Sequence, residues 1–217
     1  IGSGYYWQGE MDFDLMKEAI LEAVLRCDTM RMRFMPDEQY KVLQYITPKS
    51  EMEIETWDYS AMPLKEAHEK LLEFSHGQIP MFFCEIHTIK LMKLAEGYNG
   101  IFMKLHHLAM DAFSVKVFLR DIMELYLHKL KGAPYPKPMR PYIPALMGEL
   151  AYLKSEQYAA DKKYWEESLS KTSEPIFTDY MLESRLKQQR REHPTHRFAD
   201  IHSGSPAAKA KIFEMTQ

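Results

Sequence analysis

The fold is decided by the stretch HHLAMDAFS, residues 106–114. An apolar run with strand character, Ile101 to Leu105, leads into it, and a helical pattern, Val115 to Leu130, follows it. Two histidines therefore stand at the end of a strand, an acid lies in the loop beyond, and a serine opens a helix. Strand ends aim side chains rigidly and the loops after them leave those side chains accessible, so functional residues concentrate there.

The two histidines cannot both reach the same small group. Successive strand residues point to opposite faces, so we expect one of His106 and His107 to face the core and the other a cleft. A neutral imidazole accepts a proton near pH 7. Asp111 follows four residues after His107, and two uses are open to it: holding an imidazole, or pairing with a distant cation. Opposed faces argue against a chelate of the two histidines, so we expect no bound metal.

Composition excludes several classes of protein. The 217 residues, 46% of them hydrophobic, suit one large domain or one lobe of a larger one. A net charge of −3 implies no general affinity for nucleic acid. Two distant cysteines make no disulfide framework, and no apolar run approaches the roughly 20 residues of a membrane span. No signal peptide is visible. We therefore expect a cytoplasmic protein without nucleic-acid or membrane partners.

Helical and strand patterns alternate along the chain. Helices are predicted at Met11–Cys27 with Asp12 or Asp14 as cap, Leu64–Ser75, Val115–Leu130 ended by Gly132, and Ala145–Ser170. Strands are predicted at Met30–Met35, Tyr40–Ile46, Glu51–Trp57, Met81–Leu91 and Ile101–Leu105. The proline-rich segment Ala133–Pro144 is expected to be extended. This alternation, with some strands linked as hairpins, predicts an α/β fold, a two-layer sandwich with a mixed sheet.

Residues 106–114 resemble the HHxxxDG core motif of the condensation domains of nonribosomal peptide synthetases, including the aromatic-Ser pair that follows it. Three other segments resemble the same family in its own order. Arg26–Phe34 is similar to its RHEALRTRF stretch, Ile79–Phe82 to its PLF strand start, and Tyr164-Trp165 with Leu169 to its YWxxxL helix end. Four ordered matches, over about residues 5 to 170, are far more specific than any one of them.

The resemblance implies a lobe like that of chloramphenicol acetyltransferase, a member of the same superfamily. Residues 1–175 would form the amino-terminal lobe of a condensation domain, and residues 176–217 would lead toward a carboxyl-terminal lobe that is absent here. In this family the active site lies in a cleft between two lobes. We therefore expect the chain to be inactive without the missing lobe.

The resemblance also implies the chemistry. The donor would be an aminoacyl or peptidyl thioester on the phosphopantetheine arm of one peptidyl carrier protein, and the acceptor an amine on a second. No cofactor would be bound by the chain itself, because the arms arrive on the carriers. His107 matches the histidine that the family assigns to catalysis. It would act as general base, worth roughly 10²–10⁴ in rate, or orient the amine.

The other motif residues are expected to support the site. Asp111 matches an acid that pairs with the arginine aligned with Arg31, and we expect a buried pair, with Arg33 as a competitor. His106 is expected to be an inward-facing core histidine, and Ser114 a helix cap. Ala112 stands where the family has glycine; at a positive φ it would cost roughly 1–2 kcal/mol.

Two alternatives are open, the first from another class of protein and the second from the same superfamily. One is a non-catalytic module that only docks carrier proteins, which Ala112 and the single lobe favour. The other is a stand-alone acyltransferase that uses CoA or a carrier. The amino acids joined, their stereochemistry, and condensation as opposed to epimerisation are left open by the sequence.

Overall fold

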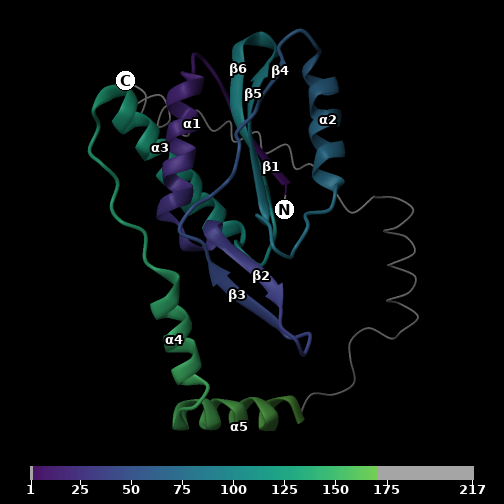
Figure 1. Ribbon diagram of the computed structural model, residues 1–217. Helices are drawn as coiled ribbons and strands as arrows, with labels where there is room; N and C mark the ends of the chain where they lie inside the picture. Colours follow the sequence, from purple (N-terminus) through teal and green to yellow (C-terminus); the bar gives the residue numbers. More distant parts are fainter. Residues whose placement is uncertain (1, 171–217) are drawn as a thin grey trace, which may run out of the picture. The chain divides into compact units, whose positions relative to one another are not determined.

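A four-stranded mixed sheet lies between helices in the first of the two units of the chain (Figure 1). The computed structural model describes residues 2–170, and the chain divides into two units, residues 1–146 and 147–217. In the first unit the strand order is β1-β6-β5-β4. The strands are β1 (Gly2–Gln8), β4 (Thr56–Tyr59), β5 (His87–Leu94) and β6 (Tyr98–Leu105). Within this sheet β4 and β5 pair in parallel and the other two pairs are antiparallel, so the predicted α/β fold with a mixed sheet is confirmed.

Strand β6 is the most enclosed element of the sheet. Every residue from Asn99 to Leu105 is buried, and β6 is hydrogen-bonded to β1 on one edge and to β5 on the other. The close approach of β1 requires Gly100, because a Cβ at this position would collide with the carbonyl oxygen of Tyr5. The end of β6 is therefore held on both edges.

Two helices cover one face of the sheet, α1 (Phe13–Arg26) and α3 (Ala112–Lys131) (Figure 1). Of the two predicted caps, Asp12 is the one that caps α1: its Oδ1 accepts from the N–H groups of Asp14 and Leu15, at 3.1 and 3.0 Å. Both helices bury apolar side chains against the strands, among them Met16, Ile20, Val24, Phe118, Ile122, Ile89, Ile101 and Met103. Alternate residues of β6 therefore point into this core.

Helix α2 (Leu64–His76) covers the opposite face (Figure 1). Its Phe74 ring packs edge-on against Trp57, with centroids 4.8 Å apart, and both rings lie near Phe102 of β6. A second, aromatic-rich core results. This helix adds a further layer to the two-layer sandwich that the sequence predicts.

An ion pair joins α1 to α3. Arg26 donates from Nε and Nη2 to the two carboxylate oxygens of Asp121, at 3.1 and 3.0 Å. The Arg26 guanidinium also donates to the carbonyl oxygens of Pro136 and Lys137, which fixes the extended segment after α3. The side chains are 14% and 7% exposed, so solvent screens the pair little. Gly132, at φ 69°, ends α3 as predicted.

A two-stranded hairpin stands apart from the main sheet. A short 3-10 helix, η1 (Asp28–Arg31), precedes β2 (Met32–Pro36), which pairs with β3 (Val42–Ile46). Arg33 on β2 donates to Glu85 Oε1 at 2.6 Å, and the same oxygen accepts from Ser50 Oγ at 2.6 Å. These bonds tie the hairpin to the segment that enters β5.

Several predicted boundaries are wrong. Strand β1 was not predicted, because two glycines interrupt its apolar alternation. The predicted strand Met81–Leu91 begins only at His87, and Glu51–Trp57 begins only at Thr56. Residues 98–100 extend β6 before its predicted start, because the turn is shortened to η2 (Ala95–Gly97). Met30 and Arg31 belong to the 3-10 helix η1 and not to a strand.

The predicted helix Ala145–Ser170 is two helices, α4 (Tyr142–Tyr152) and α5 (Glu156–Ser170). Ser155 explains the break, because its Oγ accepts from the Tyr158 N–H at 3.1 Å and caps α5. The predicted connection at residues 176–217 lies outside the described residues. No helix within residues 2–170 has the length and apolar character that crossing a membrane requires.

We expect loss of the Asp121 carboxylate to destabilise the protein strongly. Asp121→Ala leaves Arg26 buried without a counter-ion, which typically costs about 3–5 kcal/mol in the free energy of unfolding. The control is Glu124→Ala on the same helix, where an exposed pair with Arg120 at 3.7 Å is lost at a cost of about 0.5 kcal/mol. Urea denaturation of both variants measures the difference, and equal losses would contradict the role of the Arg26 pair.

Candidate active site

The candidate site lies where the chain leaves β6 and turns into α3. The His106 N–H donates to the Ile86 carbonyl at 2.9 Å, which continues the strand pairing one residue beyond β6. The His106 carbonyl then accepts from the Ala109 N–H at 3.0 Å, and the Leu108 N–H donates to His106 Nδ1 at 3.1 Å. Because Nδ1 is an acceptor, a neutral His106 ring carries its proton on Nε2 and offers it as a donor.

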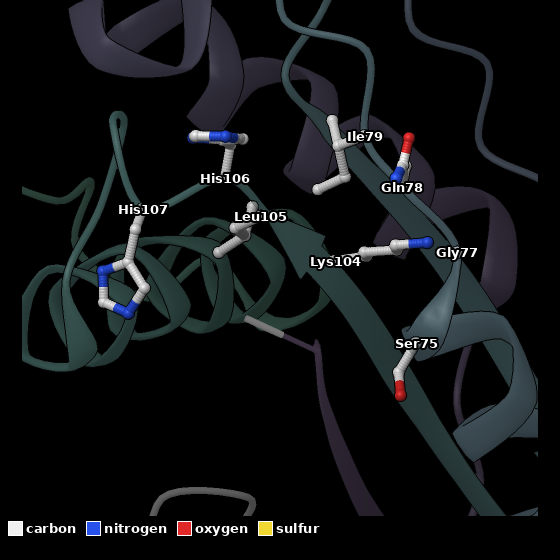
Figure 2. A pocket seen from close by; sticks show the side chains of 8 residues that line it. All are labelled: Ser75, Gly77, Gln78, Ile79, Lys104, Leu105, His106 and His107. Carbon is white, nitrogen blue, oxygen red and sulfur yellow. The ribbon is translucent and has the colours of Figure 1, made fainter. Parts of the chain in front are cut away.

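The two imidazoles point away from each other (Figure 2). This agrees with the alternation expected at a strand end. His107 is exposed, as a residue that meets substrate must be. His106 is half-buried, so its prediction as a core histidine is wrong. Among residues 2–170 the buried histidine is His87, whose Nε2 lies 2.6 Å from the Met30 carbonyl oxygen and whose pKa is lowered by burial.

A hollow of about 420 Å³ adjoins both histidines (Figure 2). Its wall is formed by the end of β6 and by the chain that follows α2. The lining residues are Ser75, Gly77, Gln78, Ile79, Lys104, Leu105, His106 and His107. Both histidines line this hollow, whereas the alternation of strand residues predicts that only one of them faces a cleft.

Within residues 2–170 Asp111 pairs with no arginine, and Arg31 pairs with Asp28, so the predicted buried pair of Asp111 with Arg31 is wrong. Asp111 is exposed and caps α3, accepting from the Ser114 N–H and from the Ser114 hydroxyl, both at 2.7 Å. These hydrogen bonds lower the pKa of the Asp111 carboxyl. The predicted cap Ser114 is therefore the third residue of the helix, and Asp111 is the cap.

Arg31 is used elsewhere. It donates to Asp28 Oδ1 at 2.7 Å and to the Thr47 carbonyl oxygen at 2.6 Å. Because Arg31 ends a 3-10 helix and Arg33 lies in β2, the two side chains do not share a strand face, and Arg33 pairs with Glu85. Both arginines support the hairpin, not the loop of the histidines.

Ala112 is accommodated without strain. It is the first residue of α3, it is exposed, and it is not among the described residues with a positive φ. The conditional cost of replacing glycine with alanine therefore does not apply here. Two features of the sequence favour a non-catalytic module, Ala112 and the single lobe, and the argument from Ala112 loses its physical basis.

Sequence reasoning missed Lys104 and Gly77, which both line the hollow. A signal for Lys104 was present: a charged residue inside an apolar strand, two positions before His106, shares its face of the sheet with that histidine. Gly77 follows the predicted helix Leu64–Ser75, and its sequence context gave no signal of a site.

Comparison with known proteins identifies the family. A family model of the condensation domain matches residues 5–201, so the chain belongs to the condensation-domain family. Among curated relatives, surfactin synthase subunit 1 of Bacillus subtilis (strain 168) is 25% identical over 171 residues, 76% of this chain and 5% of that protein. Enterobactin synthase component F of Escherichia coli (strain K12) is 28% identical over 170 residues, 73% of this chain and 13% of that protein.

Solved structures share the fold. The first condensation domain of the calcium-dependent antibiotic synthetase gives a TM-score of 0.71 at 22% identity, over 81% of this chain and 43% of the other. VibH, a condensation enzyme of nonribosomal peptide synthesis, gives 0.66 at 23% identity, over 80% of this chain and 40% of the other. The chain thus spans less than half the length of these structures and a small part of the synthetases.

We expect the cap at Asp111 to depend on a side-chain acceptor and not on a charge pair. Asp111→Asn keeps an oxygen for the Ser114 N–H and should lower the thermal midpoint less than Asp111→Ala, which removes the cap. The carboxyl has a folded pKa below its unfolded value, so its contribution is present above the unfolded pKa and is lost as pH falls through the folded pKa. Melting curves from pH 7 to pH 3 measure this. Equal loss in both variants would indicate an ionic role.

Proposed function

We propose that this chain forms one wall of an acyl-transfer site that joins an amine to a carrier-bound thioester. The observation that carries the proposal is the position of His107. In a chain of the condensation-domain family, this exposed histidine stands at the fixed end of β6 and is one of the residues that line the hollow.

The reaction exchanges a C–S bond for a C–N bond. The nitrogen of the acceptor amine attacks the thioester carbonyl, the tetrahedral intermediate collapses, and the phosphopantetheine thiolate leaves. The amine loses a proton and the thiolate gains one. An imidazole at this place serves as the base for the amine proton or orients the amine through a hydrogen bond.

The partners follow from this chemistry. A donor and an acceptor peptidyl carrier protein bring the two phosphopantetheine arms, so the chain needs no cofactor of its own. The remainder of a condensation domain supplies the opposite wall of the cleft. The openness of His107 to solvent is consistent with a site that another segment completes, and we expect no activity from this chain alone.

The test uses the complete two-lobe domain that contains this chain, with both carriers loaded. Intact-protein mass spectrometry follows the dipeptidyl thioester. We expect His107→Ala to lower the rate roughly 10²- to 10⁴-fold. The matched control is Leu108→Ala in the same loop, whose side chain is 49% exposed and whose backbone N–H is retained.

Three outcomes separate the hypotheses. Product at an unchanged rate in His107→Ala would exclude both the base and the orienting role. No product from the wild-type domain, although both carriers bind, would indicate the docking module. Product from CoA thioesters without any carrier would indicate the stand-alone acyltransferase.

A further inference from the structure

Lys104 is a buried cation in the wall of the hollow. It lies on β6 two residues before His106, on the face covered by α2, and only 7% of its surface is exposed. A lysine is rarely buried unless an acid neutralises it, because the ammonium loses its hydration. The environment of Lys104 therefore requires an explanation.

Both described partners of Lys104 are uncharged. Its Nζ donates to the Phe74 carbonyl oxygen at 2.7 Å and lies 4.7 Å from the centre of the Phe74 ring. Within residues 2–170 it forms no ion pair, and burial lowers the pKa of its ammonium. An ammonium has three donors, so two remain after the Phe74 bond. They are available to a ligand in the hollow.

The rest of the lining fits a negatively charged ligand. The side chains of Gln78 and His106 offer donors, whereas the Ser75 hydroxyl already donates to the Leu72 carbonyl oxygen at 2.6 Å, and among residues 2–170 no carboxylate lines the hollow. Gly77 leaves room at the ammonium, because a Cβ on this residue would lie 2.9 Å from Lys104 Nζ. Figure 2 shows the Lys104 side chain extending toward Gly77.

We propose that the hollow binds a carboxylate carried by the acyl or aminoacyl group of the substrate, and that Lys104 is the cation that selects it. The inference rests on the proposed function and adds the substrate class: acidic residues such as aspartate or glutamate. A phosphodiester shares the chemistry of an anionic oxygen. The phosphodiester of a pantetheine arm, however, lies at the end of the arm remote from the thioester, whereas the hollow borders His107, where the thioester reacts.

The test measures discrimination between isosteric acid and amide. The complete domain is given carriers loaded with Glu or Gln, and with Asp or Asn, as donor and as acceptor. We expect kcat/KM to favour the acid roughly 10- to 100-fold in one of the two positions, the range of a charge-assisted hydrogen bond. Lys104→Met should bring this ratio close to one, and Lys104→Arg should retain part of it.

Two further variants separate charge from structure. Gly77→Ala keeps the charge but displaces the flexible ammonium, so it should lower the ratio without removing Lys104. Lys93→Met removes an exposed lysine of β5, paired with Asp58 at 3.7 Å, and should leave the ratio unchanged. Wild-type product without acid preference would overturn the inference while leaving the proposed function intact.

Two readouts distinguish the remaining outcomes. The first readout repeats the assay with pantetheine thioesters, which lack the phosphate of phosphopantetheine thioesters. If the loss of rate caused by Lys104→Met is equal for acid and amide, and disappears with pantetheine thioesters, Lys104 binds the phosphate of the arm and the proposal is overturned. If the wild-type domain forms no product at all, the second readout, NMR of the His106 ring in this chain, tests whether the hollow binds a carboxylate. A shift with glutarate and none with glutaramide, lost in Lys104→Met, would support the carboxylate site although acyl transfer had failed. No shift with glutarate would overturn it.

Discussion

The pairing of β6 along both of its edges is the constraint on which the rest of the structure depends. Its two neighbours hold it in one register, and a core of side chains covers each face. A one-residue slip would move Lys104 and His106 to the α1–α3 face, so the register determines which groups reach the hollow. The geometry of the site is therefore set by β6, which is held on both of its edges.

The loop of the histidines is fixed at its other end by α3. Asp111 caps the start of α3, and Asp121, ten residues further along, joins α3 to α1 through Arg26. The cap is exposed and contributes local order, whereas the Arg26 pair is largely removed from water and misalignment there is costly. Two anchored elements thus bracket a short turn, and His107 is exposed without being on a long loop.

Sequence patterns predicted the parts of this arrangement that local physics controls. The helices at Met11–Cys27 and Val115–Leu130, the Asp12 cap and the strand leading into His106 follow from periodicity and capping, and the structure confirms them. Hydrogen-bond and ion-pair partners could not be predicted from such local patterns. The resemblance paired Asp111 with Arg31, but in the structure the nearer Ser114 donates to Asp111, and Arg31 donates to Asp28. Strand β1 was missed because its stability comes from pairing with β6.

The charge in β6 is difficult to explain by folding alone. Opposite Lys104 lies Gly2, and the neighbouring core of α2 is aromatic, so an apolar side chain would satisfy this face of the sheet at a lower desolvation cost. The Phe74 carbonyl compensates one donor of the ammonium and leaves its charge unneutralised. Binding of a carboxylate would turn this cost into an ion pair, since the ammonium is already desolvated and its backbone is fixed. The site would then select the acid over its amide analogue, because the amide fills the same space without neutralising the charge.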